Sequence, residues 1–263
     1  MKLILASSKD PAARNIAERL LEFFDFEKST DLDNLYVSTD TLLAIVDGES
    51  TKLTRPPVNA DELIVASRHV SESGKPSLTA HIPGELERQE LALASPSAIK
   101  SALKELLVAR DELGLPHEVS LEATHHGPTE LEIPVTFVEI GSTPEQWTNE
   151  RAGEAVARAI MKAATTQAKC TNAVGLGGPH YSPRHTEIVL NTDIGIGHIL
   201  PKYTKFDEKL VELAINRTRG GAQLLVLDWK SMNQEQRNIC QKVANRLGIR
   251  AKRSKEIISR KKL

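Results

Sequence analysis

Short apolar segments alternate with longer amphipathic segments along the first half of the chain. The apolar runs with the length of buried strands are residues 2–6, 41–46 (TLLAIV) and 63–66 (LIVA). Asp10 before Pro11 marks a helix start, because aspartate caps helices and proline fits the first turn. From 96 to 113 apolar residues recur on one helical face, and Gly114 ends that helix. The pattern predicts strands that alternate with helices.

The second half of the chain continues this alternation. Strands are predicted at residues 118–124, 134–140, 173–176 and 224–227, and helices at 144–164 and 233–247. Between them, residues 175–205 are unusually rich in glycine, proline and histidine. We expect this stretch to be a long irregular connection, and long loops in compact domains tend to carry function.

These elements predict an α/β fold with a mostly parallel or mixed central sheet flanked by helices. With 263 residues the chain has room for one large domain or two small ones. It contains no internal repeat and no long Pro/Gly/Ser linker. We therefore expect one compact domain over residues 1–263. Its 40% hydrophobic and 26% charged residues are typical of globular proteins and argue against disorder.

The formal net charge of −1 conceals a strong asymmetry. Residues 250–263 contain seven basic side chains and one acid, so this segment carries +6 and the remainder of the chain carries −7. A body of this kind cannot coat a polyanion, but it can bind one at a local patch. A solvated, partly frayed C-terminus is the alternative.

The cysteines and the N-terminus indicate a cytoplasmic protein. Cys170 and Cys240 are far apart in sequence and have no CxxC spacing, which favours buried, reduced thiols. The N-terminal MKLILASSKD has only a short apolar run, too short for a signal peptide or a membrane span. We expect no membrane association.

Histidines are concentrated next to glycine and proline. In EATHHGPT (122–129), a predicted strand carries Glu122 and then delivers His125 and His126 to its carboxyl end. Imidazole and carboxylate together form the ligand set of a catalytic zinc or the parts of a general base. Capping of a turn with Gly127-Pro128 is the structural alternative for the two histidines.

A second cluster lies in GLGGPHYSPRHT (175–186). Its glycines allow backbone N–H groups to approach an anion, and His180 and His185 follow. The string is not a dinucleotide-binding fingerprint, because Pro179 and Pro183 argue against a helix directly after it. The chain also lacks a P-loop, HExxH and GxSxG.

Single histidines follow other apolar runs, at His69, His81 and His198. A lone histidine is more often a hydrogen-bonded structural residue than a ligand. The carboxyl ends of parallel strands line one edge of a sheet, however, so several such histidines can meet there.

Several longer sequence strings, in a fixed order along the chain, match a known family more specifically than any single motif does. EATHHGPT (122–129) and GGPHYSPRHT (177–186), with SRH (67–69), HIPGE (81–85), GHILPKY (197–203) and LDWK (227–230), resemble the archaeal-type D-aminoacyl-tRNA deacylase family over essentially the whole chain. Members of this family hydrolyse the ester between a D-amino acid and the terminal adenosine of tRNA, and the family is described as zinc-dependent. The resemblance implies a fold similar to those of peptidyl-tRNA hydrolases and nucleoside phosphorylases.

Given that resemblance, we assign roles to the histidine-rich strings. We expect His125, His126 and Glu122 to hold Zn²⁺, with His69 and His198 as second choices for the metal. His180 and His185 are expected to be further ligands or proton carriers. Together with His125, His126 and Glu122 they form the predicted catalytic set.

Binding of the substrate requires further groups. The backbone of Gly177 and Gly178 is expected to serve the oxyanion, and with Pro179 to wall a pocket that distinguishes the two enantiomers. The tRNA-binding residues are expected to be Lys202, Lys205, Lys252, Arg253 and Lys255. Trp147 and Trp229 are candidates for stacking on the terminal adenine, with core packing as the alternative. We expect the enzyme to be a monomer.

Two other functions stay open at this point. One is a peptidyl-tRNA hydrolase-like or nucleoside phosphorylase-like enzyme that acts without metal. The other is a non-catalytic tRNA-binding module whose histidines are structural. Sensitivity of ester hydrolysis to a chelator separates both from a zinc-dependent deacylase.

Overall fold

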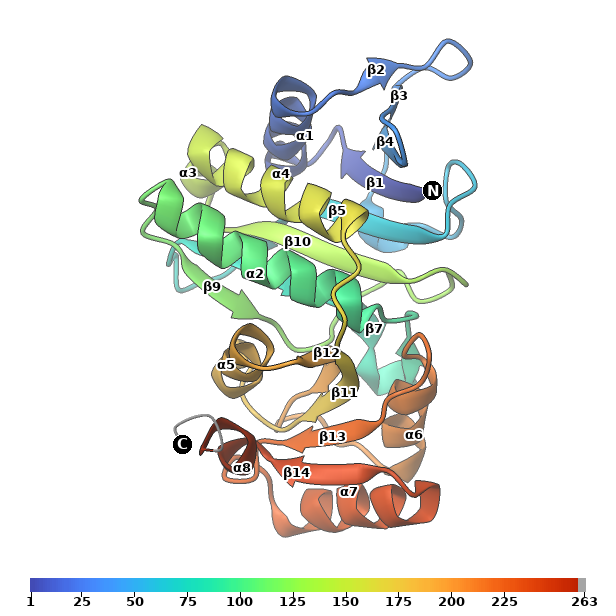
Figure 1. The fold of residues 1–263 in the computed structure, drawn as a ribbon, viewed down its shortest axis with the longest axis vertical. Helices are drawn as coiled ribbons and strands as arrows, with labels where there is room; N and C mark the ends of the chain where they lie inside the picture. The colour runs from blue at the N-terminus through green and yellow to red at the C-terminus, as the bar shows by residue number, and fades with distance from the viewer. Residues whose placement is uncertain (260–263) are drawn as a thin grey trace.

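The computed structural model describes residues 1–259 and arranges them around two main sheets (Figure 1). The larger one, called the large sheet, has eight strands in the order β2 (Glu27–Lys28), β3 (Leu35–Val37), β4 (Thr41–Val46), β1 (Lys2–Ser7), β5 (Glu62–Val70), β10 (Val135–Ser142), β6 (Ser77–His81) and β9 (Glu118–Leu121). The small sheet has four strands in the order β12 (Ile194–Leu200), β11 (Thr171–Leu176), β13 (Leu224–Leu227) and β14 (Arg250–Arg253). A short pair, β7 (Gly84–Glu85) and β8 (Glu90–Leu91), flanks the 3-10 turn η2 (Leu86–Arg88), and a second such turn, η1 (Ser50–Lys52), follows β4.

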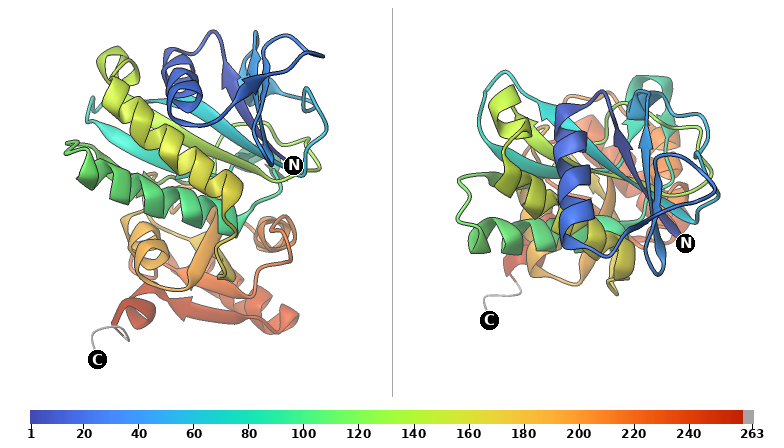
Figure 2. Two further views of the ribbon diagram at one scale, coloured as in Figure 1. Left: turned by 45° about the horizontal axis from the view of Figure 1, so that its top comes forward. Right: turned by 90° about the horizontal axis from the view of Figure 1, so that it is seen from above.

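Three long helices cover one face of the large sheet (Figures 1 and 2). They are α1 (Pro11–Phe23), α2 (Pro96–Glu112) and α4 (Glu150–Thr165), and α4 packs against both α1 and α2. The single helix predicted over 144–164 is divided into α3 (Pro144–Trp147) and α4. The division falls at Asn149, whose side chain accepts a hydrogen bond from Ala152 N and so caps the new helix.

The small sheet is sandwiched between two pairs of helices. They are α6 (Glu208–Asn216) with α7 (Gln234–Leu247), and α5 (Pro183–Asn191) with α8 (Ser254–Ser259). Alternate residues of its strands point to opposite faces and pack in two different hydrophobic cores. Ala173 and Val226 belong to the main core, which also contains residues of the large sheet, whereas Val174 and Leu225 pack with α6 and α7. The main core therefore continues from the large sheet onto the small one.

The predicted α/β architecture is confirmed. Strands β4, β1, β5 and β10 are parallel, and antiparallel pairs occur where β6 joins β10 and where β3 joins β4. All four strands of the small sheet are parallel. The central sheet is therefore mixed and mostly parallel, and a second sheet is added to it.

The prediction of an irregular connection over residues 175–205 is wrong, because α5 and β12 lie inside it. Pro183 does not prevent a helix, because it occupies the first turn of α5. Backbone N–H groups in that turn have no acceptor within the helix, so the N–H that proline lacks is not needed. Glycines in β12 reflect close packing rather than a loop. A Cβ on Gly195 would lie 2.8 Å from Pro96 O, and one on Gly197 would lie 2.9 Å from Ala94 Cβ.

Two smaller expectations can be compared with the structure. Both cysteines are free, with Cys240 buried and Cys170 half-buried. Within residues 1–259, no helix combines the length and the apolar character needed to span a bilayer.

Candidate functional site

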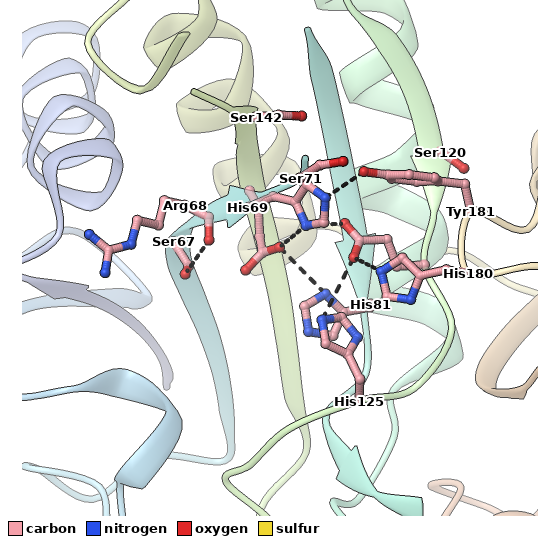
Figure 3. A network of polar contacts seen from close by, with 12 residues as sticks. Ser67, Arg68, His69, Ser71, His81, Ser120, His125, Ser142, His180 and Tyr181 are labelled. Atoms are coloured by element: carbon pink, nitrogen blue, oxygen red, sulfur yellow. Dashed lines mark hydrogen bonds and ion pairs between the residues drawn. The ribbon is translucent and has the colours of Figure 1, made fainter. Parts of the chain in front are cut away.

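Neighbouring strands of the large sheet direct three titratable side chains to one face. His69 of β5 is in register with Gly141 of β10, and His81, at the end of β6, is in register with Phe137 of β10. Glu139 lies midway between these positions on β10, so by the strand registers its side chain shares a face with those of His69 and His81, both labelled in Figure 3. A Cβ at Gly141 would lie 2.8 Å from His69 Cδ2, so glycine leaves room for the imidazole.

Glu122, directly after β9, connects three histidines. Its Oε2 accepts a hydrogen bond from His180 Nε2 at 2.9 Å and lies 3.7 Å from His125 Nε2, while its Oε1 lies 3.2 Å from His69 Nδ1. Burial raises the pKa of this carboxyl, but hydrogen bonds from His180 and His69 outweigh it and hold the pKa well below its usual range. Glu122 is therefore an ionised carboxylate that is 1% exposed.

Backbone pairing brings the two sheets together at this point. Glu122 forms an antiparallel bridge with Tyr181 in the loop after β11, and Ala123 N donates to His180 O at 2.8 Å. Ser182 N donates to Leu121 O at 3.0 Å. These bonds place His180, in the loop after β11 of the small sheet, beside residues of the large sheet.

The backbone fixes the tautomers of His125 and His126. His125 Nδ1 lies 2.7 Å from Ala123 O, and His126 Nδ1 lies 2.6 Å from Gly127 O. A carbonyl oxygen only accepts, so each Nδ1 carries the hydrogen and each Nε2 keeps a free lone pair. Burial lowers the pKa of both rings, that of His125 to about 4, which makes them neutral near pH 7.

His81 completes a group of three neutral imidazoles with His125 and His126, which we call the metal group. Each member offers a ligand atom within 4.8 Å of the others, and His81 Nε2 lies 3.2 Å from His126 Nε2. Burial lowers the pKa of His81 well below its ordinary value. Its buried Nδ1 has no hydrogen-bond partner among residues 1–259 and faces Glu139 Oε2 at 3.8 Å.

This donor set fits a zinc ion. Two nitrogens bound to one tetrahedral zinc at ~2.0–2.1 Å are roughly 3.3 Å apart, close to the separation of the His81 and His126 nitrogens. Neutral histidines held by a carbonyl or carboxylate behind the ring are typical zinc ligands. Three protein ligands leave a fourth position for water or substrate.

A second group, formed by His69, Glu122 and His180, has a different electrostatic character. Burial lowers the pKa of His69, but hydrogen bonds with Glu122 and Glu139 raise it overall to about 11. Burial and the nearby Glu122 raise the pKa of Glu139 to about 7. His69 is thus a cation held between carboxylates, and its Nε2 lies 2.5 Å from Tyr181 Oη.

Two cavities meet at His125 and His126, which line both. The first, about 430 Å³, lies at the carboxyl ends of β1, β4 and β5 and also contains His69, Glu139 and His180. The second, about 680 Å³, is lined by β7, η2 and the loop after β12. The two histidines therefore face a space on either side.

His185 and His198, both predicted as site residues, lie elsewhere. His185 is fully buried in α5 with its Nε2 3.3 Å from Val226 O. His198 is fully buried in β12, between Thr124 Oγ1 at 3.2 Å and Ala92 O at 2.9 Å. Burial lowers the pKa of both, that of His198 to about 4. Their contacts are those of structural histidines.

The N–H groups of Gly177 and Gly178, which were predicted to serve the oxyanion, have acceptors within the protein. Gly177 N donates to Leu200 O at 2.8 Å, and Gly178 N donates to Ser231 Oγ at 2.6 Å, so both N–H groups are already used. Gly177, Gly178 and Pro179 are also not among the residues that line the two cavities beside His125 and His126. The positive φ angles of the two glycines, 85° and 87°, shape the turn that carries His180.

The predicted tRNA-binding residues gather at the carboxyl edge of the small sheet. Because its strands are parallel, the loops after β11 and β12 and the end of β14 emerge at one edge. Lys202 and Lys205 are exposed in the loop after β12, Lys252 and Arg253 end β14, and Lys255 follows in α8. Residues 250–259 are thus a strand and a helix, while Arg260, Lys261 and Lys262 lie outside the described residues.

Sequence reasoning missed Glu139 and underrated His81. A lone carboxylate inside the apolar strand PVTFVEI was the available signal for Glu139, because charge is rarely buried without a partner. His81 stood at the end of SLTAH, and only the antiparallel register of β6 with β10 brings it to the other histidines.

Together these features define a class: an α/β protein with a buried histidine–carboxylate centre that can hold a metal. The family model described as D-aminoacyl-tRNA deacylase matches residues 57–252, and the chain belongs to this family.

Relatives match almost end to end. A D-aminoacyl-tRNA deacylase of Pyrococcus furiosus is 37% identical, covering 95% of this chain and 98% of its own length. One of Archaeoglobus fulgidus is 35% identical, with 98% of each chain covered. A crystal structure titled as a conserved protein of unknown function has a TM-score of 0.89 and 33% identity, covering 98% of this chain and 96% of its own.

Proposed function

We propose that this protein hydrolyses the ester bond of D-aminoacyl-tRNA, releasing the D-amino acid and free tRNA. The observation that carries the proposal is the metal group, in which neutral imidazoles with free Nε2 atoms stand between two cavities. An ester has an acyl part and an alcohol part on either side of the bond that breaks, and two adjoining cavities suit such a substrate. The name shared by its relatives supports this substrate.

We further propose that the metal is zinc and that His81, His125 and His126 hold it. His81 takes the place that we first gave to Glu122, because its ring nitrogen lies beside that of His126. When bound, Zn²⁺ supplies Lewis acidity and makes water acidic near neutral pH. Glu139 faces His81 Nδ1 and would keep that hydrogen in place, while Glu122 lies next to the group, 3.7 Å from His125.

His180 is our candidate for proton transfer. Its Nε2–H donates to Glu122, so its Nδ1 is the acceptor atom, and Tyr203 Oη lies 3.2 Å from it. In hydrolysis, water oxygen bonds to the acyl carbon, the bond to the ribose oxygen breaks, and a proton must reach that oxygen. His180 would accept a proton from the water at Nδ1 and would deliver it to the ribose oxygen, while Glu122 stabilises the imidazolium.

Binding of tRNA is assigned in this proposal to the carboxyl edge of the small sheet. Lys202, Lys205, Lys252, Arg253 and Lys255 are the basic groups that would contact phosphates there. Arg253 stacks on Trp229, 4.2 Å from the ring centroid, and such stacking holds a guanidinium ready for phosphate. A monomer acting in the cytoplasm completes the proposal.

The decisive experiment measures hydrolysis of matched D-tyrosyl-tRNA and L-tyrosyl-tRNA before and after metal removal. We expect the D-substrate to be hydrolysed faster, with a loss on the order of 10³-fold after chelation and recovery on adding Zn²⁺. Equal rates on both enantiomers, or full activity of the metal-free protein, would refute the proposal. An N-blocked aminoacyl-tRNA and a nucleoside, tested in parallel, should not be consumed.

A further inference from the structure

Tyr203 is an exposed aromatic side chain beside the histidine site. It lies in the loop between β12 and α6, is 63% exposed, and has its Oη 3.2 Å from His180 Nδ1. A tyrosine ring is apolar and can stack on another ring, while its hydroxyl can form hydrogen bonds. Next to the candidate proton carrier, the exposed ring is available to a substrate.

The loop that carries Tyr203 is braced from both sides. Lys202 N donates to Gly178 O at 2.9 Å, and the Gln236 side chain donates to Lys202 O at 3.1 Å and to Thr204 O at 3.3 Å. Gln236 is itself buried and forms part of the capping box of α7. The ring therefore projects from a fixed backbone and loses little conformational freedom when it binds.

The surroundings of the ring match a nucleotide. Tyr203, Thr204 and Lys205 line the 680 Å³ cavity that ends at His125 and His126, a volume within the usual ~300–1,000 Å³ of small-molecule sites. Lys202 and Lys205 lie in the same loop, just before and two residues after Tyr203, and both are exposed. Aromatic faces combined with flanking cations are how proteins bind single-stranded nucleic acid.

The two tryptophans are less suited to this role. Trp147 donates from its Nε1 to His69 O, and the Arg68 guanidinium lies 5.4 Å from its ring centroid. Trp229 carries the guanidinium of Arg253 over its ring. Neither tryptophan is among the residues that line the two cavities beside His125 and His126, whereas Tyr203 lines the larger one.

We propose that Tyr203 is the stacking platform for the terminal adenine of the tRNA substrate. The 680 Å³ cavity then holds the terminal nucleotide, and the 430 Å³ cavity on the other side of His125 and His126 takes the aminoacyl group. Glu85 and Glu87, on the wall of the larger cavity, can accept hydrogen bonds from ribose hydroxyls or the adenine amino group. This inference rests on the proposed function, because it presupposes a tRNA substrate.

The test measures equilibrium binding of uncharged tRNA with its terminal adenosine and of the same tRNA lacking it, at one fixed salt concentration. Stacking of one base is worth about 5- to 150-fold in affinity, so the wild-type protein should prefer the complete tRNA by about tenfold. Tyr203→Ala should abolish this preference, and Tyr203→Phe, which keeps the aromatic face, should retain it. Phe23→Ala, which removes a 49% exposed aromatic on α1, is the matched control and should leave it unchanged.

Two results would overturn the assignment. One is a wild-type protein that binds both tRNAs equally, and the other is a Tyr203→Ala variant that keeps the preference. Loss of the preference in Tyr203→Phe would also count against it, because the hydroxyl rather than the ring would then be responsible. Binding of uncharged tRNA needs no turnover, so these outcomes stay separate from a failure of ester hydrolysis.

Discussion

The histidine site on the large sheet and the carboxyl edge of the small sheet gather polar residues in opposite ways. Glu122, His81 and Glu139 are almost completely buried, and each is surrounded by other titratable groups. Lys202 and Tyr203 are exposed on a loop. Burial shifts protonation states and suits chemistry, whereas exposure leaves charges free to meet a polyanion. The contrast suggests that catalysis and tRNA affinity can be altered separately.

Replacement of a proposed metal ligand in the buried histidine site should have the largest effect. We expect His126→Ala to lower kcat for D-tyrosyl-tRNA on the order of 10³-fold and to reduce bound zinc, because one of three imidazoles is lost. The measurements are single-turnover hydrolysis and metal content, with uncharged tRNA binding unchanged. His117→Gln, a histidine before β9 and outside the cluster, is the control and should keep both values. Full zinc content and activity in His126→Ala would exclude it as a ligand.

Removal of positive charge from the carboxyl edge of the small sheet should weaken tRNA binding without changing catalysis. In a Lys252→Ala, Arg253→Ala, Lys255→Ala variant we expect KM to rise and kcat to hold. The slope of log affinity against log salt should fall by up to ~2–3, since each lost phosphate contact removes about 0.7–0.9.

The matched control for that variant removes the same charge from another surface. Lys104, Lys162 and Lys169 are exposed on α2, on α4 and in the loop after α4. Their joint replacement by alanine should leave the salt slope as in the wild type. Equal slopes in both triple variants would move the tRNA site away from β14 and α8.

A change at the turn between the two regions should have the smallest effect. Gly178 has a φ of 87°, and a Cβ there would lie no closer than 3.6 Å to its neighbours, so Gly178→Ala costs only backbone strain, about 1–2 kcal/mol. We expect a lower thermal midpoint and an unchanged ratio of D to L hydrolysis. Gly221→Ala, at a φ of 73° in open space, should lose similar stability. A changed D/L ratio only in Gly178→Ala would restore this glycine as part of the chiral pocket.

The elements that depend on local pattern were predictable. Apolar runs predicted β1, β4 and β13 within a residue or two, and the helix predicted over 233–247 is α7, which Asn233 caps and Gly248 ends. Residues 175–205 were mispredicted because glycine and proline there serve close packing and a helix start, which depend on neighbours far away in the chain.

The site was predictable only in part, for a related reason. His125, His126, Glu122 and His180 lie in strings whose composition already indicated chemistry, and the structure brings them together. Strand register brings His81 and Glu139 next to these residues. His185 lies apart from them, because helix α5 directs its side chain toward Val226 O. Register and helix rotation are tertiary properties, and single-residue patterns do not encode them.

The bridge between Glu122 and Tyr181 also joins parts of the site that are far apart in the chain. All three members of the metal group precede residue 127, whereas His180 and Tyr203 come from segments synthesised later. A fragment that ended before β11 would contain every residue of the metal group but would lack the candidate proton carrier and the proposed base platform. The two sheets therefore form one functional unit.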